Sequence, residues 1–140
     1  MKRIWIFFGF LFLAGNVLFA QRSVPVQEVS LEPKPHIEFE ATVHDFGRIP
    51  LQSDATCEFE FTNTGSVPLV LSQVKASCGC TVPEWPREPI LPGEKGIIKV
   101  KYTTVNRPNV INKAVIVHSN ADNNQVILRI RGEVVNEGSL

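Results

Sequence analysis

The sequence predicts an all-β domain, a β-sandwich of about seven strands that follows a signal peptide. Three observations support this fold class. Apolar and polar residues alternate with a period of two in several short runs, which indicates strands with one buried face. Turn residues separate these runs at intervals of roughly ten residues, a spacing typical of sandwiches. No stretch of the mature chain repeats its apolar residues with a helical period.

The first twenty residues have the layout of a secretory signal peptide. Lys2 and Arg3 precede an almost unbroken apolar run over residues 4–13, and the small Ala20 comes before a polar stretch that opens at Gln21. The run is shorter than the ~20 residues of a spanning helix. We therefore expect an exported protein, periplasmic or extracellular, whose mature chain does not span a membrane. The alternative is an uncleaved N-terminal anchor.

The mature chain has the length of one domain and a charge that argues against nucleic acid as a partner. The signal peptide takes Lys2 and Arg3 with it, so the 14 basic side chains fall to 12 against 14 acidic ones, a net charge of −2. A nucleic-acid-binding domain needs a basic stripe instead. Residues 21–36 predict a flexible leader, residues 37–135 the domain and residues 136–140 a tail.

The first strand begins at Ile37, and the clearest strand covers residues 55–62. Apolar residues alternate there with threonine and glutamate. Cys57, Phe59 and Phe61 consequently share one face of the strand, and we expect all three side chains to lie in the core.

Two further stretches predict irregular backbone. Asp45-Phe46-Gly47 offers an apolar side chain to close the core and a glycine that permits a turn or bulge. Asn63-Thr64-Gly65 predicts a turn.

Residues 67–74 predict the next strand, in which Leu71 is in phase and Val74 is out of phase. The change of phase indicates a bulge or bend at Val74.

A proline-rich loop, residues 83–92, separates these strands from the last three. Its prolines exclude a central strand because proline cannot donate to the ladder, and Pro92-Gly93 suits a type II turn. Residues 98–102, 111–118 and 126–135 then predict strands. Residues 111–118 are apolar on both faces, so we expect that strand in the middle of a sheet.

Five groups of residues carry a family resemblance. They are Phe59-x-Phe61-x-Asn63-x-Gly65, Ser77-Cys78-Gly79-Cys80-Thr81-Val82-Pro83, Pro92-Gly93-Glu94, Ser119-Asn120 and Gly132-Glu133-Val134. Together they resemble the bacterial domain of unknown function number 1573, which is grouped with Hydin-type immunoglobulin-like domains. The resemblance covers about residues 40–135. It implies an immunoglobulin-like sandwich in an exported bacterial protein and no assigned activity. One departure is Asn109-Val110-Ile111, where many relatives have a glycine followed by an aromatic residue, so we expect a different turn there.

Cys78-Gly79-Cys80 is the stretch where we expect any chemistry, and several interpretations stay open. Two thiolates suit copper(I), and the spacing is similar to that of cytochrome oxidase copper chaperones. Alternatively, the pair forms a redox-active disulfide in a small, strained ring, or one cysteine forms a mixed disulfide with a partner. The structural interpretation packs the sulfurs as small hydrophobes or bridges one of them to Cys57. An odd total of three cysteines leaves at least one outside any internal disulfide.

The other candidate residues carry less specific signals. Trp85, in the proline-rich loop, predicts either a binding anchor or a cap on the end of the sandwich. His36, His44 and His118 are scattered, and no nucleophile with a base is visible, so we assign no catalytic residue. We assign structural roles to Cys57, Phe59, Phe61, Leu71, Pro92 and Gly93.

The leading hypothesis is an exported, non-enzymatic immunoglobulin-like module that binds a protein or helps to assemble a larger complex. We expect no cofactor in that case. The alternative is a periplasmic copper(I)-binding or thiol-redox protein that acts through Cys78 and Cys80.

Overall fold

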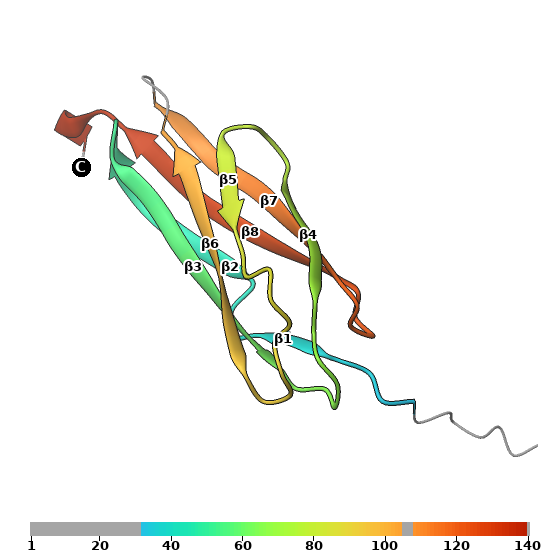
Figure 1. Cartoon of the computed structure of the whole chain (residues 1–140). Coiled ribbons are helices and arrows are strands. Elements are labelled where there is room, and N and C mark those ends of the chain that lie inside the picture. The colour runs from blue at the N-terminus through green and yellow to red at the C-terminus, as the bar shows by residue number, and fades with distance from the viewer. Residues whose placement is uncertain (1–31, 105–107, 140) are drawn as a thin grey trace, which may run out of the picture. The chain divides into compact units, whose positions relative to one another are not determined.

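The computed structural model describes residues 32–104 and 108–139, which form two four-stranded β-sheets packed as a sandwich (Figure 1). The strands are β1 (Ile37–Phe39), β2 (Val43–Pro50), β3 (Asp54–Asn63), β4 (Leu71–Ala76), β5 (Thr81–Glu84), β6 (Lys95–Thr103), β7 (Asn109–Ser119) and β8 (Gln125–Val135), followed by a 3-10 turn, η1 (Glu137–Ser139). One sheet has the order β1-β3-β6-β5 and the other β2-β8-β7-β4. The predicted all-β sandwich is confirmed, with eight strands instead of about seven.

The first strand that the sequence did not predict is β2. Its register against β8 shifts between Asp45 and Arg48, and Gly47 has a φ of 64° at this point. The bulge expected at Gly47 is therefore confirmed, and it explains why the strand shows no clean alternation. β2 pairs with β8 in parallel. The hydrogen bonds between the two strands therefore hold β2 in the sheet, although its alternation of apolar and polar residues is weak.

The second unpredicted strand is β5, a short strand at the start of the proline-rich stretch. It lies at the edge of its sheet and pairs with β6, where Pro83 is opposite Val100. An edge position tolerates Pro83 because only one side of the strand needs ladder hydrogen bonds. The expectation that no central strand forms here is confirmed.

β4 begins later than the sequence predicted. Leu69 forms an isolated bridge with Ile90, and the strand itself starts at Leu71. The register against β7 shifts between Leu71 and Gln73, not at Val74, whose side chain is buried. The irregularity thus lies just before the predicted position and brings both apolar side chains to the core. β7 is central in its sheet, as expected.

The core lies between the two sheets and takes alternate residues from the long strands. Phe59 and Phe61 in β3 are 2% and 0% exposed, and Leu71 in β4 is 6% exposed. Gly96 in β6 faces the Phe61 ring so closely that a Cβ there would lie 2.3 Å from it. The predicted core residues are therefore buried, and a missing side chain in β6 makes room for the largest of them.

Asn63, a fully buried polar residue, joins two turns at one end of the sandwich. Its side-chain amide donates to the carbonyl oxygens of Val67 and Ile90 at 2.8 and 2.9 Å. Its Oδ1 accepts from the Gly65 N–H at 3.0 Å. Its backbone carbonyl accepts from the N–H of Gly93, whose φ of 81° is the value that a type II turn requires. Burial of this amide is therefore compensated by hydrogen bonds.

Residues 34–36 are bound to the sandwich, although the sequence placed them in the flexible leader. The Thr64 N–H donates to the His36 carbonyl at 3.0 Å. The Asp122 N–H donates to the Pro35 carbonyl, also at 3.0 Å. The side chains of His36 and Asp122 are 2.6 Å apart. Backbone hydrogen bonds of this kind leave no trace in a hydropathy pattern, so the boundary moves from residue 37 to residue 34.

Some predictions concern residues outside the described ranges. The predicted signal peptide, residues 1–20, and leader residues 21–31 belong to this group, as do residues 105–107 before β7. None of the helical segments in the described ranges has the length and apolar character to cross a membrane.

Candidate functional site

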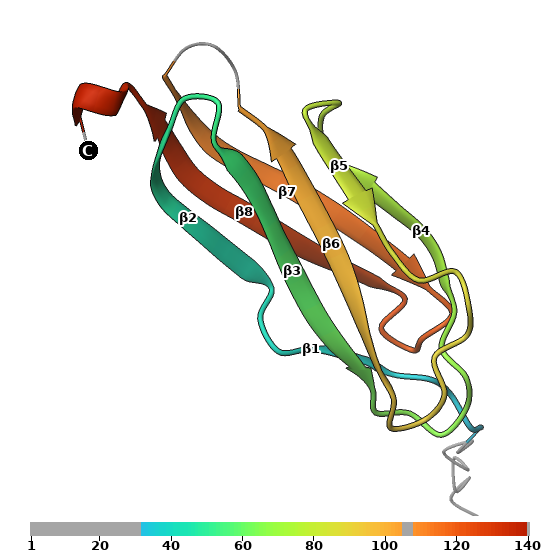
Figure 2. The same cartoon turned by 60° about the vertical axis from the view of Figure 1, so that its left-hand side comes forward.

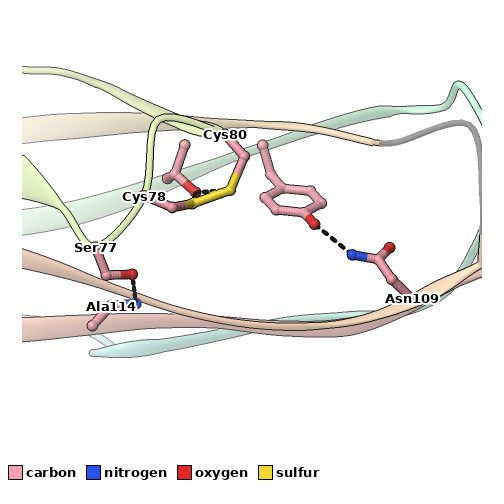
Figure 3. Close-up of a disulfide and its surroundings, with 7 residues drawn as sticks. Ser77, Cys78, Cys80, Asn109 and Ala114 are labelled. Atoms are coloured by element: carbon pink, nitrogen blue, oxygen red, sulfur yellow. Dashed lines mark hydrogen bonds between the residues drawn. A yellow bond between two sulfur atoms is a disulfide. The ribbon is translucent and has the colours of Figure 1, made fainter.

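Cys78 and Cys80 form a disulfide in the turn that joins β4 to β5 (Figure 3). β4 and β5 are edge strands of different sheets, and they lie side by side in Figures 1 and 2. The turn is therefore the place where the chain crosses from one sheet to the other. Of the open interpretations, a bridge from either cysteine to Cys57 does not occur here, because Cys57 is a free thiol.

Backbone hydrogen bonds hold this turn to both sheets. On one side the Ser77 N–H donates to the Ala114 carbonyl at 2.9 Å, and the Ala114 N–H donates to the Ser77 hydroxyl at 3.2 Å. On the other side the Thr103 N–H donates to the Cys80 carbonyl at 2.8 Å. The disulfide thus lies on a well-supported backbone and not on a free loop.

The two sulfurs have a weakly polar environment. Thr81 Oγ1 lies 3.6 Å from Cys78 Sγ and 4.0 Å from Cys80 Sγ, and it is their only side-chain hydrogen-bonding partner within the described chain. Both cysteines are half-buried, and Cys80 packs against the core. Within these residues, no neighbouring base contacts the sulfurs.

The copper(I) hypothesis rests on the two reduced thiols alone. Among residues 32–104 and 108–139 there is no group of three or more His, Cys, Asp or Glu side chains that could hold a metal ion. A disulfide has no thiolate to offer, so copper(I) would require reduction of Cys78 and Cys80 first.

Cys57 lies in β3 opposite Val100 and is 5% exposed. Burial, with a smaller contribution from the Glu58 charge, raises the pKa of the thiol to about 11. Thiolate is the reactive form of cysteine, so this residue is poorly suited to exchange or metal binding. Its position agrees with the buried thiol that the strand phase predicted.

Trp85 combines features of both roles proposed for it. The ring is half-buried and packs against the core, as a cap does. Arg87 covers the ring with its guanidinium carbon 3.8 Å from the centroid. Trp85 also lines a shallow groove of about 350 Å³ together with Glu58, Glu84, Ile97 and Lys99. Its buried Nε1 has no hydrogen-bond partner among the described residues.

The three histidines do not form a catalytic group. His36 bonds Asp122, and this hydrogen bond is the main reason that the pKa of Asp122 lies below its usual value. His44 packs its ring edge-on against Phe46, with centroids 4.6 Å apart. His118 is half-buried in β7 opposite Gln125.

The structure also assembles a surface that the sequence reasoning missed, on the outer side of the β2-β8-β7-β4 sheet. Leu128 and Ile130 of β8 point into the core, so Ile127, Arg129 and Arg131 point outward. Figure 2 shows β8 between β2 and β7. We call this surface the β8 face and define it by Val43, Lys75, Ile116, Ile127, Arg129 and Arg131.

The β8 face joins exposed apolar side chains to arginines without acidic partners. Ile127 lies beside Ile116, and Val43 lies beside Arg129. Within the described residues, neither Arg129 nor Arg131 forms an ion pair. The alternation of Arg129 and Arg131 with buried residues was visible in the sequence, but their neighbours across the sheet were not.

Two acidic side chains beside Arg131 interact with other groups of the chain. Asp45, opposite Arg131, accepts the Gly47 N–H in the β2 bulge at 2.7 Å. Glu133 pairs with Arg48 at 3.6 Å. Beside this bulge lies a hollow of about 360 Å³ whose lining includes Arg131, Val110 and Gly132.

On the outer side of the other sheet most charges are paired within the chain, with the exception of Lys101, which lies opposite the exposed Val82 and forms no ion pair within the described residues. We call this side the β6 face and define it by Glu58, Glu60, Glu84, Lys95, Ile97 and Lys99. Lys95 contacts both Glu60 and Glu40, the latter at 3.0 Å, and Lys99 lies 3.5 Å from Glu58. The hydrogen bond from Lys95 lowers the pKa of Glu60, and that pairing raises the pKa of Lys95.

The family comparison covers nearly the whole sandwich. Residues 37–134 match a family described as a protein of unknown function, DUF1573. No curated protein of similar sequence was found.

Three solved structures have a similar fold. A protein of unknown function from Porphyromonas gingivalis W83 is 18% identical with a TM-score of 0.58, over 73% of this chain and 47% of that chain. A PapD-like domain of human CEP192 is 8% identical with a TM-score of 0.56, over 75% and 89%. The E. coli chaperone DraB is 12% identical with a TM-score of 0.51, over 76% and 57%. The chain therefore spans less than half of the Porphyromonas protein, and these likenesses show the fold alone.

Proposed function

We propose that this chain, which belongs to the DUF1573 family of proteins of unknown function, is an exported and non-enzymatic module that binds another protein. The observation that carries the proposal is the β8 face, where exposed apolar side chains adjoin arginines without acidic partners. Surfaces of this composition are typical of interaction sites. One structure of similar fold, DraB, is a chaperone, and chaperones act on other proteins.

A matched pair of isoleucines tests the proposal. Ile127 on the β8 face and Ile97 on the β6 face are 45% and 46% exposed, so they differ in location and not in accessibility. A photo-crosslinking amino acid is placed at either position in the full-length protein, which is then produced in its own bacterium. We expect a discrete crosslinked protein from position 127 and none from position 97. Equal crosslinking at both positions, or none at position 127, would contradict the proposal.

Export is tested by the mass of the protein recovered outside the cytoplasm. The proposed signal peptide predicts a mature chain that begins near Gln21. A mass that retains residues 1–20 would contradict cleavage and favour the N-terminal anchor.

A second candidate function is thiol exchange or copper(I) binding at Cys78 and Cys80. The observation that favours it is the half-buried disulfide in a turn between two edge strands. Thiol titration of the native protein, before and after mild reduction and with and without added copper(I), separates the candidates. Two thiols that appear readily and disappear with copper(I) would support this function. A bridge that resists mild reduction would count against both of its forms.

A further inference from the structure

We propose that the β8 face recognises an acidic, apolar protein segment, whose carboxylates contact Arg129 and Arg131 and whose apolar side chains cover Ile127 and Val43. This inference rests on the proposed function, because it states the chemistry of the partner that would bind at the same surface. It extends that function from protein binding in general to one class of sequence.

The spacing of the side chains sets the spacing expected in the partner. Outward residues of one strand recur every second position, about 7 Å apart. Arg129 is thus about 7 Å from Ile127 along β8, and Arg131 about 13 Å from it. Val43 extends the apolar part sideways because it is opposite Arg129 in the neighbouring strand. In a complementary extended segment, the two carboxylates therefore lie about 7 and 13 Å from an apolar side chain on the same face.

Charge complementarity identifies the class of partner. Arginine binds carboxylates through two parallel hydrogen bonds, and its guanidinium is more weakly hydrated than the ammonium group of lysine. Two acidic side chains line the hollow together with Arg131: Asp45, whose Oδ1 accepts the Gly47 N–H, and Glu133, which pairs with Arg48. Neither carboxylate forms an ion pair with Arg129 or Arg131 within the described residues, so both guanidinium groups can bind a carboxylate from another chain.

Arg131 lines the hollow beside the β2 bulge, so its side chain borders a concave surface. Gly132, which also lines the hollow, allows β8 to approach the bulge closely, because a Cβ at this position would meet the Gly47 carbonyl oxygen at 2.9 Å and the Phe46 Cβ at 3.1 Å. Val110, which is 72% exposed, supplies an apolar wall. A partner side chain that enters here meets Val110 and the Arg131 guanidinium, with the carboxylates of Asp45 and Glu133 at the same hollow.

Other anionic partners fit the β8 face less well. Asp45 and Glu133 interrupt the positive charge, whereas a nucleic acid or an anionic membrane favours a continuous basic surface. The exposed isoleucine and valine add an apolar requirement that a phosphate backbone does not meet. A protein segment satisfies both conditions.

The test uses a fluorescent synthetic peptide of about eight residues in which a leucine is followed by glutamates at the second and fourth positions after it, so that the three side chains share one face of an extended chain. The same peptide with glutamine in place of glutamate is the control. Fluorescence anisotropy measures binding to the full chain at about 0.05 and 0.3 M salt. We expect the glutamine peptide to bind at least about tenfold more weakly, and we expect the glutamate peptide to lose affinity at high salt.

Two matched charge reversals locate the binding site. Arg131→Glu on the β8 face is compared with Lys101→Glu on β6, because both cations are exposed and neither has an ion pair within the described chain. We expect Arg131→Glu to weaken the glutamate peptide by at least about tenfold and Lys101→Glu to change it by less than about twofold. Thermal unfolding of both variants shows that each is folded.

Several results would overturn the inference. They are equal affinity for the two peptides, an equal effect of the two reversals, or tighter binding of anionic lipid vesicles than of the glutamate peptide. If crosslinking at position 127 succeeds while the peptides bind equally, the proposed function stands and this inference fails. If position 127 does not crosslink and neither peptide binds, both fail.

Discussion

The β6 face and the β8 face have the same construction and different electrostatics. Each is the outer side of a four-stranded sheet, and each exposes one isoleucine to nearly the same extent, Ile97 at 46% and Ile127 at 45%. On the β6 face, Lys95 and Lys99 contact glutamates of the same chain. On the β8 face, the neighbouring carboxylates bind the bulge backbone or Arg48, and Arg131 is left without a partner within the described residues.

This difference separates two uses of surface charge. Charges that are paired within one sheet favour association less, because an incoming group must displace an existing partner. Unmatched arginines beside apolar side chains favour association with a complementary surface. In the β2 bulge the Gly47 N–H donates to Asp45 Oδ1, and Asp45, although opposite Arg131, forms no ion pair with it within the described residues.

The largest expected effect comes from a substitution in the core beneath the β6 face. Phe59→Ala deletes a side chain that is 2% exposed, and the resulting cavity should lower the free energy of unfolding by about 2–5 kcal/mol. Thr56→Ala, on the outward side of the same strand, should change it by less than about 0.5 kcal/mol. Denaturant unfolding measures both. Equal losses would show that the inward and outward positions of β3 are assigned incorrectly.

The next effect concerns the backbone under the β8 face. Gly132 has a φ of 153°, and a Cβ would meet the Gly47 carbonyl, so Gly132→Ala should cost about 1–3 kcal/mol in unfolding free energy. It should also distort the hollow beside Arg131. Gly79→Ala is the control, because a Cβ there has no neighbour within 4 Å and its φ is not positive. A Gly132→Ala protein as stable as the control would contradict the close approach of β2 and β8.

A smaller effect is expected where the two sheets meet. The disulfide between Cys78 and Cys80 encloses one residue, so it restricts the unfolded chain very little. Replacing both by serine should lower the melting temperature much less than Phe59→Ala does. Calorimetry of the parent, the reduced parent and the double variant makes the comparison. A loss as large as that of Phe59→Ala would indicate a structural role and end the thiol and copper(I) hypotheses.

The smallest effect is the pH response of the β6 face. The folded pKa of Glu60 lies below its ordinary 4.5, so its ionisation stabilises the fold above pH 4.5, and this contribution disappears as the pH falls through the folded pKa. The folded pKa of Lys95 lies above its ordinary 10.5, so its contribution is present below pH 10.5 and disappears as the pH rises through the folded pKa.

Lys95→Met should reduce both losses of stability, the one at acid pH that involves Glu60 and the one at alkaline pH that involves Lys95. Melting temperatures of the parent and the variant, measured from acid to alkaline pH, should differ most near neutrality. The difference should be small because both groups are exposed and screened by solvent. Lys101→Met is the control, since Lys101 has no ion pair within the described chain. An identical pH response of the two variants would contradict a stabilising role for the Lys95 pairs.

The sequence by itself determined the all-β class and the buried faces of the long strands. A strand that is half-buried must alternate, so the phase of Cys57, Phe59 and Phe61 predicted which side chains face the core. It also indicated the bulge at Gly47 and the edge character of the stretch around Pro83, because each depends on the conformational limits of a single residue.

The tertiary structure alone decided which segments become neighbours. β2 forms because β8 offers it a parallel edge, and residues 34–36 are held by backbone hydrogen bonds to residues far along the chain. The β8 face has the same origin. Arg131 stands in the sequence two positions from Arg129 and Glu133, but only the pairing of β2 with β8 brings Asp45 beside it, and only the bulge engages that carboxylate. A charge is matched or unmatched according to its neighbours in space, which a pattern along one strand does not contain.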